Sequence, residues 1–241
     1  MTTFAPALHA EWLKIRTLRS LYGTLVALFA ATTAFSALAG AETPEPDLDP
    51  LFTALSGVLP GQIAAITFGA LAVSAEYQAG ALRLSLSAVP RRGRWFVAKA
   101  TAIAVLALTV GLVTTLAALA AGRAGLGDAA SGLSAGEQVR GVLGSALYLT
   151  LMALFAAGLT ALLRSGVATL SLLIPFVLVV SFVLGDAAGG ATEFLPDKAG
   201  QVALYETYDG TLGPWSGLAV TALWTAAALV AGAWSVRRRD A

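Results

Sequence analysis

Very few residues of this chain could carry out nucleophilic, acid–base or metal chemistry. The sequence has no cysteine and a single histidine, His9, which excludes disulfides, thiolate sites and any site that needs two imidazoles. A phosphate-binding P-loop needs a lysine followed by serine or threonine, but the three lysines are followed by Ile15, Ala100 and Ala199. The sequence therefore predicts no catalytic residue, no metal site and no cofactor in this chain.

A Gly-x-Ser-x-Gly pattern surrounds Ser134, as in hydrolases whose nucleophile is a serine. That role needs a strand–turn–helix setting and a histidine base within hydrogen-bond distance. The surrounding segment is rich in Gly, Ala and Ser, and the topology predicted from the charges places His9 on the opposite side of a membrane. We interpret the match as accidental.

The charged residues are too sparse for a soluble domain and are grouped between long apolar runs. Of all residues 57% are hydrophobic and 12% charged, against about 25% charged in soluble domains. Six runs of 21 to 27 residues contain no Asp, Glu, Lys or Arg, and about 20 helical residues cross a bilayer core. None alternates as a β-barrel strand would. The sequence predicts an all-α integral membrane protein, one transmembrane domain over 1–241, with spans at about 20–41, 53–75, 98–121, 141–163, 166–185 and 214–236.

The charges between the runs predict that both termini are cytoplasmic. With the N-terminus inside, 12 of the 15 basic residues fall on the inner side and 11 of the 14 acidic residues on the outer side. Basic residues resist translocation, so this asymmetry sets the orientation. A competing interpretation is a signal peptide cleaved near Ala39, but the apolar run is longer than the 7–15 residues typical of such peptides.

The segments outside the spans have patterns of their own. In residues 1–19, Leu8, Trp12 and Ile15 share one helical face, which predicts an amphipathic helix on the inner leaflet. Residues 186–213 are too apolar for a plain outer loop and too short to span, so a re-entrant or interfacial piece is expected. Because proline removes a helical hydrogen bond, we expect kinks near Pro60 and Pro175.

The largest inner loop, 76–99, combines an apolar helical face with a basic turn. Leu82, Leu86 and Val89 have helical spacing, Pro90 ends that helix, and arginines follow. Either the loop contacts lipid phosphates, as positive inner loops do, or it docks a cytoplasmic protein. The residues alone leave both interpretations open.

Three segments, in order and on the expected sides, resemble the membrane subunits of bacterial type 2 ABC transporters. Residues 11–17, Glu-Trp-Leu-Lys-Ile-Arg-Thr, are similar to the E-W-x-K-x-R-[ST] motif of that family. Residues 76–99 resemble its E-[YR]-x-x-G-T-L-R…P-x-[SR]-R…K stretch, with Ala81 in place of the usual threonine. Residues 195–200 are similar to its L-P-x-x-A-G segment before the last span.

The resemblance implies a homodimeric or heterodimeric permease in the bacterial plasma membrane, driven by two copies of a separate ATPase that binds ATP and Mg. It implies a connecting helix carrying Glu11, Trp12, Lys14, Ile15 and Arg16. It also implies a coupling helix between the second and third spans. The ATPase contacts it implies are Glu76, Tyr77, Gly80, Leu82, Arg83, Leu86, Val89, Pro90, Arg91, Arg92 and Arg94.

The function that this resemblance implies is that of the membrane subunit of an ATP-driven exporter of amphipathic molecules such as lipids, peptides or drugs. A non-transporting assembly, immunity or sensor subunit would have the same topology. An intramembrane enzyme would need polar residues clustered at one depth, which the sequence does not indicate, and a secondary transporter would need repeats that are not evident. Membrane lipids are expected partners, and nucleic acid is not.

Overall fold

The computed structural model describes residues 4–42, 49–77, 92–180, 183 and 189–238, and every regular element in these ranges is a helix. The long helices are α2 (Arg19–Ala41), α4 (Val58–Ser74), α6 (Arg92–Leu126), α7 (Ala135–Leu163) and α11 (Pro214–Arg238). The shorter elements, in chain order, are α1 (Phe4–Thr17), α3 (Pro50–Leu55), η1 (Ala75–Tyr77), η2 (Gly127–Ala130), α8 (Gly166–Pro175), η3 (Phe176–Val180), η4 (Gly189–Phe194), α10 (Pro196–Gln201) and η5 (Val202–Leu204).

Five helical stretches are long and apolar enough to cross a membrane. They are Arg19–Ala41, Pro50–Tyr77, Arg92–Ala130, Ala135–Leu163 and Pro214–Arg238. The fifth predicted run forms a shorter apolar helix, Gly166–Val179, within the described residues. For the described residues, the prediction of an all-helical chain with several helices long and apolar enough to span a membrane is confirmed, whereas the sixth crossing and the cytoplasmic termini stay predictions.

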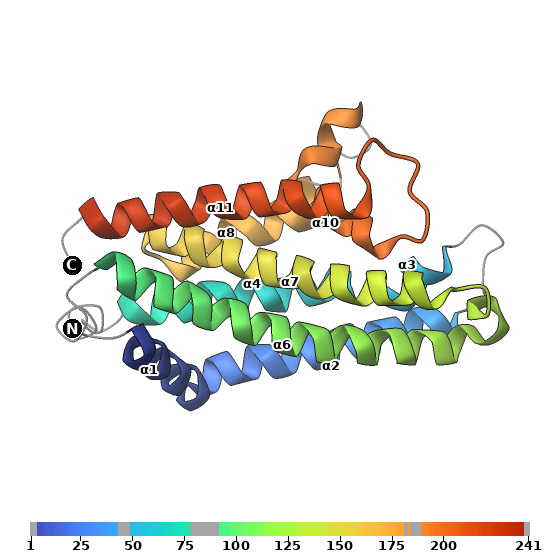
Figure 1. Cartoon of the computed structure of the whole chain (residues 1–241), viewed down its shortest axis with the longest axis horizontal. Coiled ribbons are helices and arrows are strands. Elements are labelled where there is room, and N and C mark those ends of the chain that lie inside the picture. Colours follow the sequence, from blue (N-terminus) through green and yellow to red (C-terminus); the bar gives the residue numbers. More distant parts are fainter. Residues whose placement is uncertain (1–3, 43–48, 78–91, 181–182, 184–188, 239–241) are drawn as a thin grey trace.

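The long helices form a bundle whose central member is α7. Helix α7 packs against α4, α6 and α11, while α2 packs against α4 and α6, and α8 against α4 and α7. Figure 1 shows that α1, the start of α6 and the end of α11 lie at one end of the bundle, and that α3 lies at the other. The contacts of α1 with α2 and α6 place it against the bundle itself.

Small residues allow the helices of this bundle to approach closely. A Cβ added to Gly158 in α7 would lie 2.6 Å from the carbonyl carbon of Ala228 in α11. In contrast, a Cβ added to Gly23 on α2 would meet nothing within 4 Å. Close backbone approach at small residues is a usual source of van der Waals packing between membrane helices.

Each proline singled out in the sequence lies near a change of helix geometry. Helix α3 ends before Ser56 and Gly57, and Pro60 lies in the first turn of α4, where its missing N–H is not needed. The Gly57 N–H donates to Ser36 Oγ at 3.1 Å, which satisfies the backbone at this break. Pro175 is the last residue of α8, and the π-helical turn η3 follows it.

The segment before α11 consists of short helical pieces held to the bundle by polar contacts. Asp49, which caps α3 through the Phe52 N–H, also accepts from the Glu206 N–H at 2.7 Å. Arg140 donates to the Glu206 carbonyl at 3.0 Å. Helix α10 packs on α7 and α11. Whether this segment enters the membrane stays a prediction.

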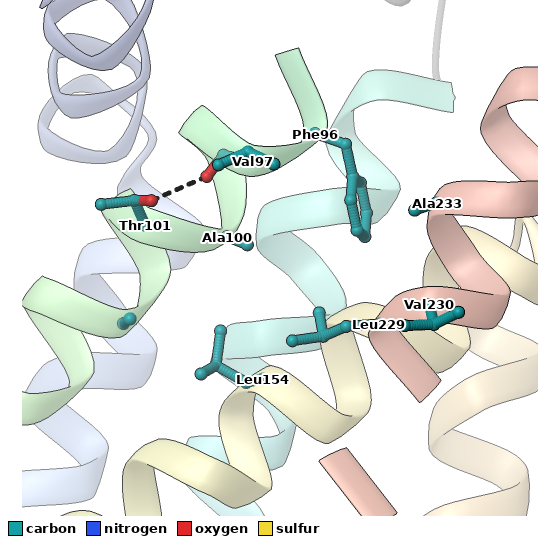
Figure 2. A pocket seen from close by; sticks show the side chains of 9 residues that line it. Phe96, Val97, Ala100, Thr101, Leu154, Leu229, Val230 and Ala233 are labelled. Atoms are coloured by element: carbon teal, nitrogen blue, oxygen red, sulfur yellow. Dashed lines mark hydrogen bonds between the residues drawn. The ribbon is translucent and has the colours of Figure 1, made fainter. Parts of the chain in front are cut away.

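A lateral groove of about 360 Å³ lies between α6, α7 and α11. Figure 2 shows its walls, which include Val97 and Ala100 of α6, Leu154 of α7, and Val230 and Ala233 of α11. The walls are apolar, and their one hydroxyl, on Thr101, donates to the Val97 carbonyl of its own helix at 2.8 Å. The surface of the groove is therefore hydrocarbon, without an unsatisfied polar group among its lining side chains.

Candidate functional site

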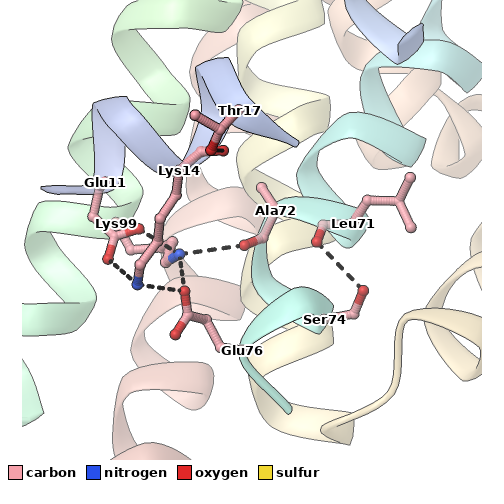
Figure 3. Close-up of polar contacts among 8 residues, drawn as sticks. All are labelled: Glu11, Lys14, Thr17, Leu71, Ala72, Ser74, Glu76 and Lys99. Atoms are coloured by element: carbon pink, nitrogen blue, oxygen red, sulfur yellow. Dashed lines mark hydrogen bonds and ion pairs between the residues drawn. The ribbon is translucent and has the colours of Figure 1, made fainter. Parts of the chain in front are cut away.

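Four charged side chains from three elements meet at the end of the bundle that carries α1. Glu11 and Lys14 come from α1, Glu76 from η1 and Lys99 from α6 (Figure 3). Glu11 and Lys14 are three residues apart and so lie on one face of their helix. The site therefore joins the first helix to the end of the second apolar stretch and the start of the third.

Each lysine of this charge cluster contacts both glutamates. Lys14 Nζ lies 3.1 Å from Glu11 Oε1 and 2.8 Å from Glu76 Oε1. Lys99 Nζ lies 2.7 Å from Glu76 Oε1 and also forms an ion pair with Glu11 Oε2. Lys99 Nζ also donates to the Ala72 carbonyl at 3.4 Å and lies 5.8 Å from the centroid of the Trp95 ring. The two positive and two negative charges compensate each other within one site.

Burial makes this compensation necessary. The side chains of Glu11, Glu76 and Lys99 are each only 3% exposed, whereas that of Lys14 is 37% exposed. An isolated charge in such surroundings is strongly unfavourable, and removing one partner of a buried pair costs several kcal/mol. The four side chains therefore form a unit in which no member is dispensable by itself.

The charge cluster also shifts the pKa of its most exposed member, Lys14. Partial burial lowers the pKa of Lys14, but the hydrogen bond to Glu76 and the negative charges of Glu11 and Glu76 outweigh this effect and raise the pKa above its ordinary value. Lys14 is therefore a cation throughout the physiological pH range, and it contacts two carboxylates.

The residues on both sides of segment 78–91 are attached to the bundle. Before it, Glu76 belongs to the charge cluster, and the Tyr77 hydroxyl donates to the Ala161 carbonyl of α7 at 3.4 Å. After it, Arg92 Nη1 donates to the Val236 carbonyl of α11 at 3.2 Å. The residues on either side of segment 78–91 therefore contact α1, α6, α7 and α11.

The structure describes only part of the predicted contact set. Gly80, Leu82, Arg83, Leu86, Val89, Pro90 and Arg91 lie outside the described residues, so the coupling helix stays a prediction. Arg94 lies in the first turn of α6, half-buried beside the buried Trp95.

The face of α1 that packs inward differs from its apolar stripe. Ile15 is buried, as its apolar character favours, but Trp12 is 38% exposed and Glu11 is buried. Arg16 lies in the same helix. Glu11 turns inward because Lys99 of α6 supplies its counter-charge, a long-range contact that helical periodicity cannot show.

Lys99 is the residue of this site that sequence reasoning missed, since it appeared only as the last position of a motif. A signal was present nevertheless. Glu11 and Glu76 are two of only three acidic residues on the predicted inner side, and two of the three lysines lie close to them in the predicted topology. Acidic residues that oppose the general charge asymmetry are candidates for buried pairs with those lysines.

A second buried polar group lies away from the charge cluster. The Tyr148 hydroxyl of α7 donates to Gln62 Oε1 of α4, and Gln201 of α10 lies 3.4 Å from the same hydroxyl. Three polar side chains from three helices therefore meet in this group, which the sequence did not indicate. The group was missed because each helix contributes a single polar residue, which no local pattern reveals.

Ser134 has a structural role at the start of α7. Its hydroxyl accepts from the Glu137 N–H at 3.3 Å, and Glu137 Oε2 accepts from the Ser134 N–H at 2.8 Å. This reciprocal arrangement is a capping box, which satisfies free backbone donors at a helix start. Across the described ranges, His, Cys, Asp and Glu side chains nowhere gather in a group of three that could hold a metal ion.

Comparison with known proteins adds no identification, because no family model and no curated protein sequence matches the chain significantly. The class of protein that fold and site define is thus a multi-pass helical membrane protein with a buried charge cluster at one end.

Proposed function

We propose that this chain is the membrane subunit of an ATP-driven bacterial exporter of the type 2 ABC class. In this proposal it crosses the plasma membrane six times with both termini in the cytoplasm. It pairs with a second permease subunit, identical or not, and docks two copies of a separate ATPase that binds ATP and Mg. The observation that carries the proposal is the charge cluster of Glu11, Lys14, Glu76 and Lys99 beside segment 78–91.

The charge cluster suits a chain that receives mechanical work at an inner loop. A loop that transmits force needs rigidly held ends. Here the residues before the loop are held by buried ion pairs, and Arg92 after it is held by a hydrogen bond to α11. Helix α1 shares the same ion pairs, so it moves with the loop as one body. Closure of an ATPase pair against segment 78–91 would then reorient α4 and α6 together.

The proposed substrate is amphipathic. The buried faces of the long helices consist of Ala, Leu, Val and Phe with scattered hydroxyl groups. The polar group at Tyr148 adds hydrogen-bonding side chains to the bundle interior. Such walls favour a molecule with a large apolar part, such as a lipid, a peptide or a drug-like compound.

Co-purification tests the proposal. We expect the tagged chain, extracted in mild detergent, to bring with it an ATPase that contains a P-loop. Reconstituted in vesicles, the complex hydrolyses ATP faster than the ATPase alone. The double substitution Arg83→Glu/Arg91→Glu abolishes this stimulation without affecting membrane insertion, because both charges lie in the docking loop.

Lys198→Glu, a charge reversal in α10 at the other end of the bundle, is the control and keeps the stimulation. Unchanged ATP hydrolysis in the double variant would refute the role of the loop. A chain that purifies without any ATPase would instead favour a non-transporting assembly, immunity or sensor subunit.

A further inference from the structure

The groove between α6, α7 and α11 has features that the proposed function does not use. Its volume of about 360 Å³ falls in the range of ligand pockets, about 300–1,000 Å³. It opens sideways, because Val97 is 54% and Val230 is 68% exposed on the outer surface of the bundle. A molecule that enters this groove therefore comes from the surroundings of the helices rather than from the bundle interior.

The groove extends along the helices toward their charged ends. On α6 its lining runs from Phe96 to Ala104, a rise of about 12 Å at 1.5 Å per residue. On α11 the next residue on the lining face after Ala233, one turn further on, is Arg237. One turn before Val97 on α6 lies Gly93. These two residues meet one helical turn beyond the lining residues Val97 and Ala233.

Arg237 crosses from α11 onto α6 at this point. A Cβ added to Gly93 would lie 2.7 Å from Arg237 Nη2, so the guanidinium rests on the bare backbone of the glycine. Arg237 is exposed, and it forms no ion pair with any acid in the described part of the chain. Its charge is therefore available at the mouth of an apolar groove.

Further groups at the same end suit a membrane interface. Arg238 lies 5.0 Å from the centroid of the Trp234 ring, and Trp234 is 52% exposed, one turn from Val230. Arg92 is anchored to the Val236 carbonyl beside them. Exposed tryptophan and arginine at a helix end are typical of the headgroup region of a bilayer.

We propose that the groove binds an anionic phospholipid, with one acyl chain along Val97, Ala100, Leu229, Val230 and Ala233 and the headgroup phosphate at Arg237. The hydrocarbon walls exclude a purely polar ligand, and the guanidinium selects a negative headgroup over a zwitterionic one. The ligand is then a lipid of the leaflet next to α1, held at a site built from two helices that are far apart in the sequence. This site does not depend on the transport proposal.

Native mass spectrometry of the purified chain tests the site, with dioleoylphosphatidylglycerol as the probe and dioleoylphosphatidylcholine as the zwitterionic comparison. We expect tighter binding of the anionic lipid. Arg237→Gln weakens that binding about fivefold, the order expected for one basic residue at an anionic surface, and weakens phosphatidylcholine binding by a smaller factor, because choline already offsets the charge of its phosphate. Ala233→Phe fills the groove and weakens the binding of both lipids. Glycerol 3-phosphate, a headgroup without chains, does not bind.

Ala227→Phe is the matched control, since Ala227 is exposed on the same helix and does not line the groove. It leaves lipid binding unchanged and reports on the fold. Arg237→Lys, which keeps the charge, retains the preference for the anionic lipid. The proposal is overturned if Ala233→Phe binds phosphatidylglycerol as the unmodified chain does. It is also overturned if that substitution removes a dimer peak instead, because a second copy of the chain would then occupy the groove.

Discussion

At the scale of single residues, the charge cluster is the most unusual feature of this chain. Glu11, Glu76 and Lys99 are almost fully buried, and among the described residues the only other carboxylate or lysine buried to this degree is Asp197 of α10. Replacing a buried ion pair with apolar residues is often neutral or stabilising, so stability alone gives little reason for these charges. We infer that these charges specify how α1, η1 and α6 pack, because the observed arrangement pairs all four groups.

Glu76→Gln tests this interdependence. We expect it to lower the free energy of unfolding by about 3–5 kcal/mol, because Lys99 then keeps its charge in a buried site with one carboxylate fewer. The double variant Glu76→Met/Lys99→Met loses less than the single one, since Glu11 and Lys14 remain as a neutral pair. Denaturant unfolding in detergent measures both. A double variant less stable than Glu76→Gln would contradict the interdependence.

The docking of α1 should weaken in alkali. The pKa of Lys14 is raised in the folded chain, so its contribution is complete below the ordinary value of 10.5 and is lost as pH rises through the higher folded pKa. A spin label at Ala10→Cys, an exposed position, becomes more mobile in that range. Lys14→Arg stays charged to higher pH and delays the change. The same midpoint in both proteins would rule out Lys14 as the titrating group.

At the scale of elements, the apolar runs located the long helices well, because length and hydropathy alone determine whether a segment can span. The helix boundaries differ from those of the predicted spans where contacts between helices act. The run beginning at Pro50 is divided at Ser56 and Gly57, where a side chain of α2 satisfies the backbone. Helix α6 begins at Arg92, before the predicted span, because arginine and lysine can place their charges at the interface while their stems pack.

The crossing of α7 and α11 depends on small residues that no periodicity identifies. We expect Gly158→Ala to destabilise the protein by about 1–3 kcal/mol, since the new methyl group would lie 2.6 Å from the Ala228 backbone. Gly23→Ala, where a Cβ meets nothing, is neutral or stabilising. Unfolding of both variants in the same detergent gives the comparison. Equal stability would show that the helices can separate at little cost.

At the scale of the whole molecule, the alternation of long helices follows from the spacing of the charges, but the number of crossings depends on one short helix. Gly166–Val179 is 14 residues long by its numbering, about 21 Å of helix, which is less than the bilayer core. Sequence composition cannot show that this run ends in a π-helical turn after Pro175. The buried charge cluster could not be foreseen either, since its members are separated by up to 88 residues.

Cysteine labelling resolves the topology, and the chain needs no prior removal of native cysteines. We expect an impermeant maleimide to label Gly132→Cys and Gly190→Cys in intact cells and Ala10→Cys only after the membrane is opened. Gly132 and Gly190 suit this purpose because a side chain there meets nothing within 4 Å. Labelling of Gly190→Cys only in opened cells would show that the chain crosses five times.

The pairing of Glu11 with Lys99 sets an order of events during synthesis. The first helix leaves the ribosome about 85 residues before its lysine partner on α6, a delay of roughly 4–17 s at 5–20 residues per second. Throughout that interval its carboxylate has only Lys14 of the same helix as a partner, so α1 stays hydrated at the membrane surface. The amino-terminal helix is made first, yet it reaches its final position only after the third apolar stretch has entered the bilayer.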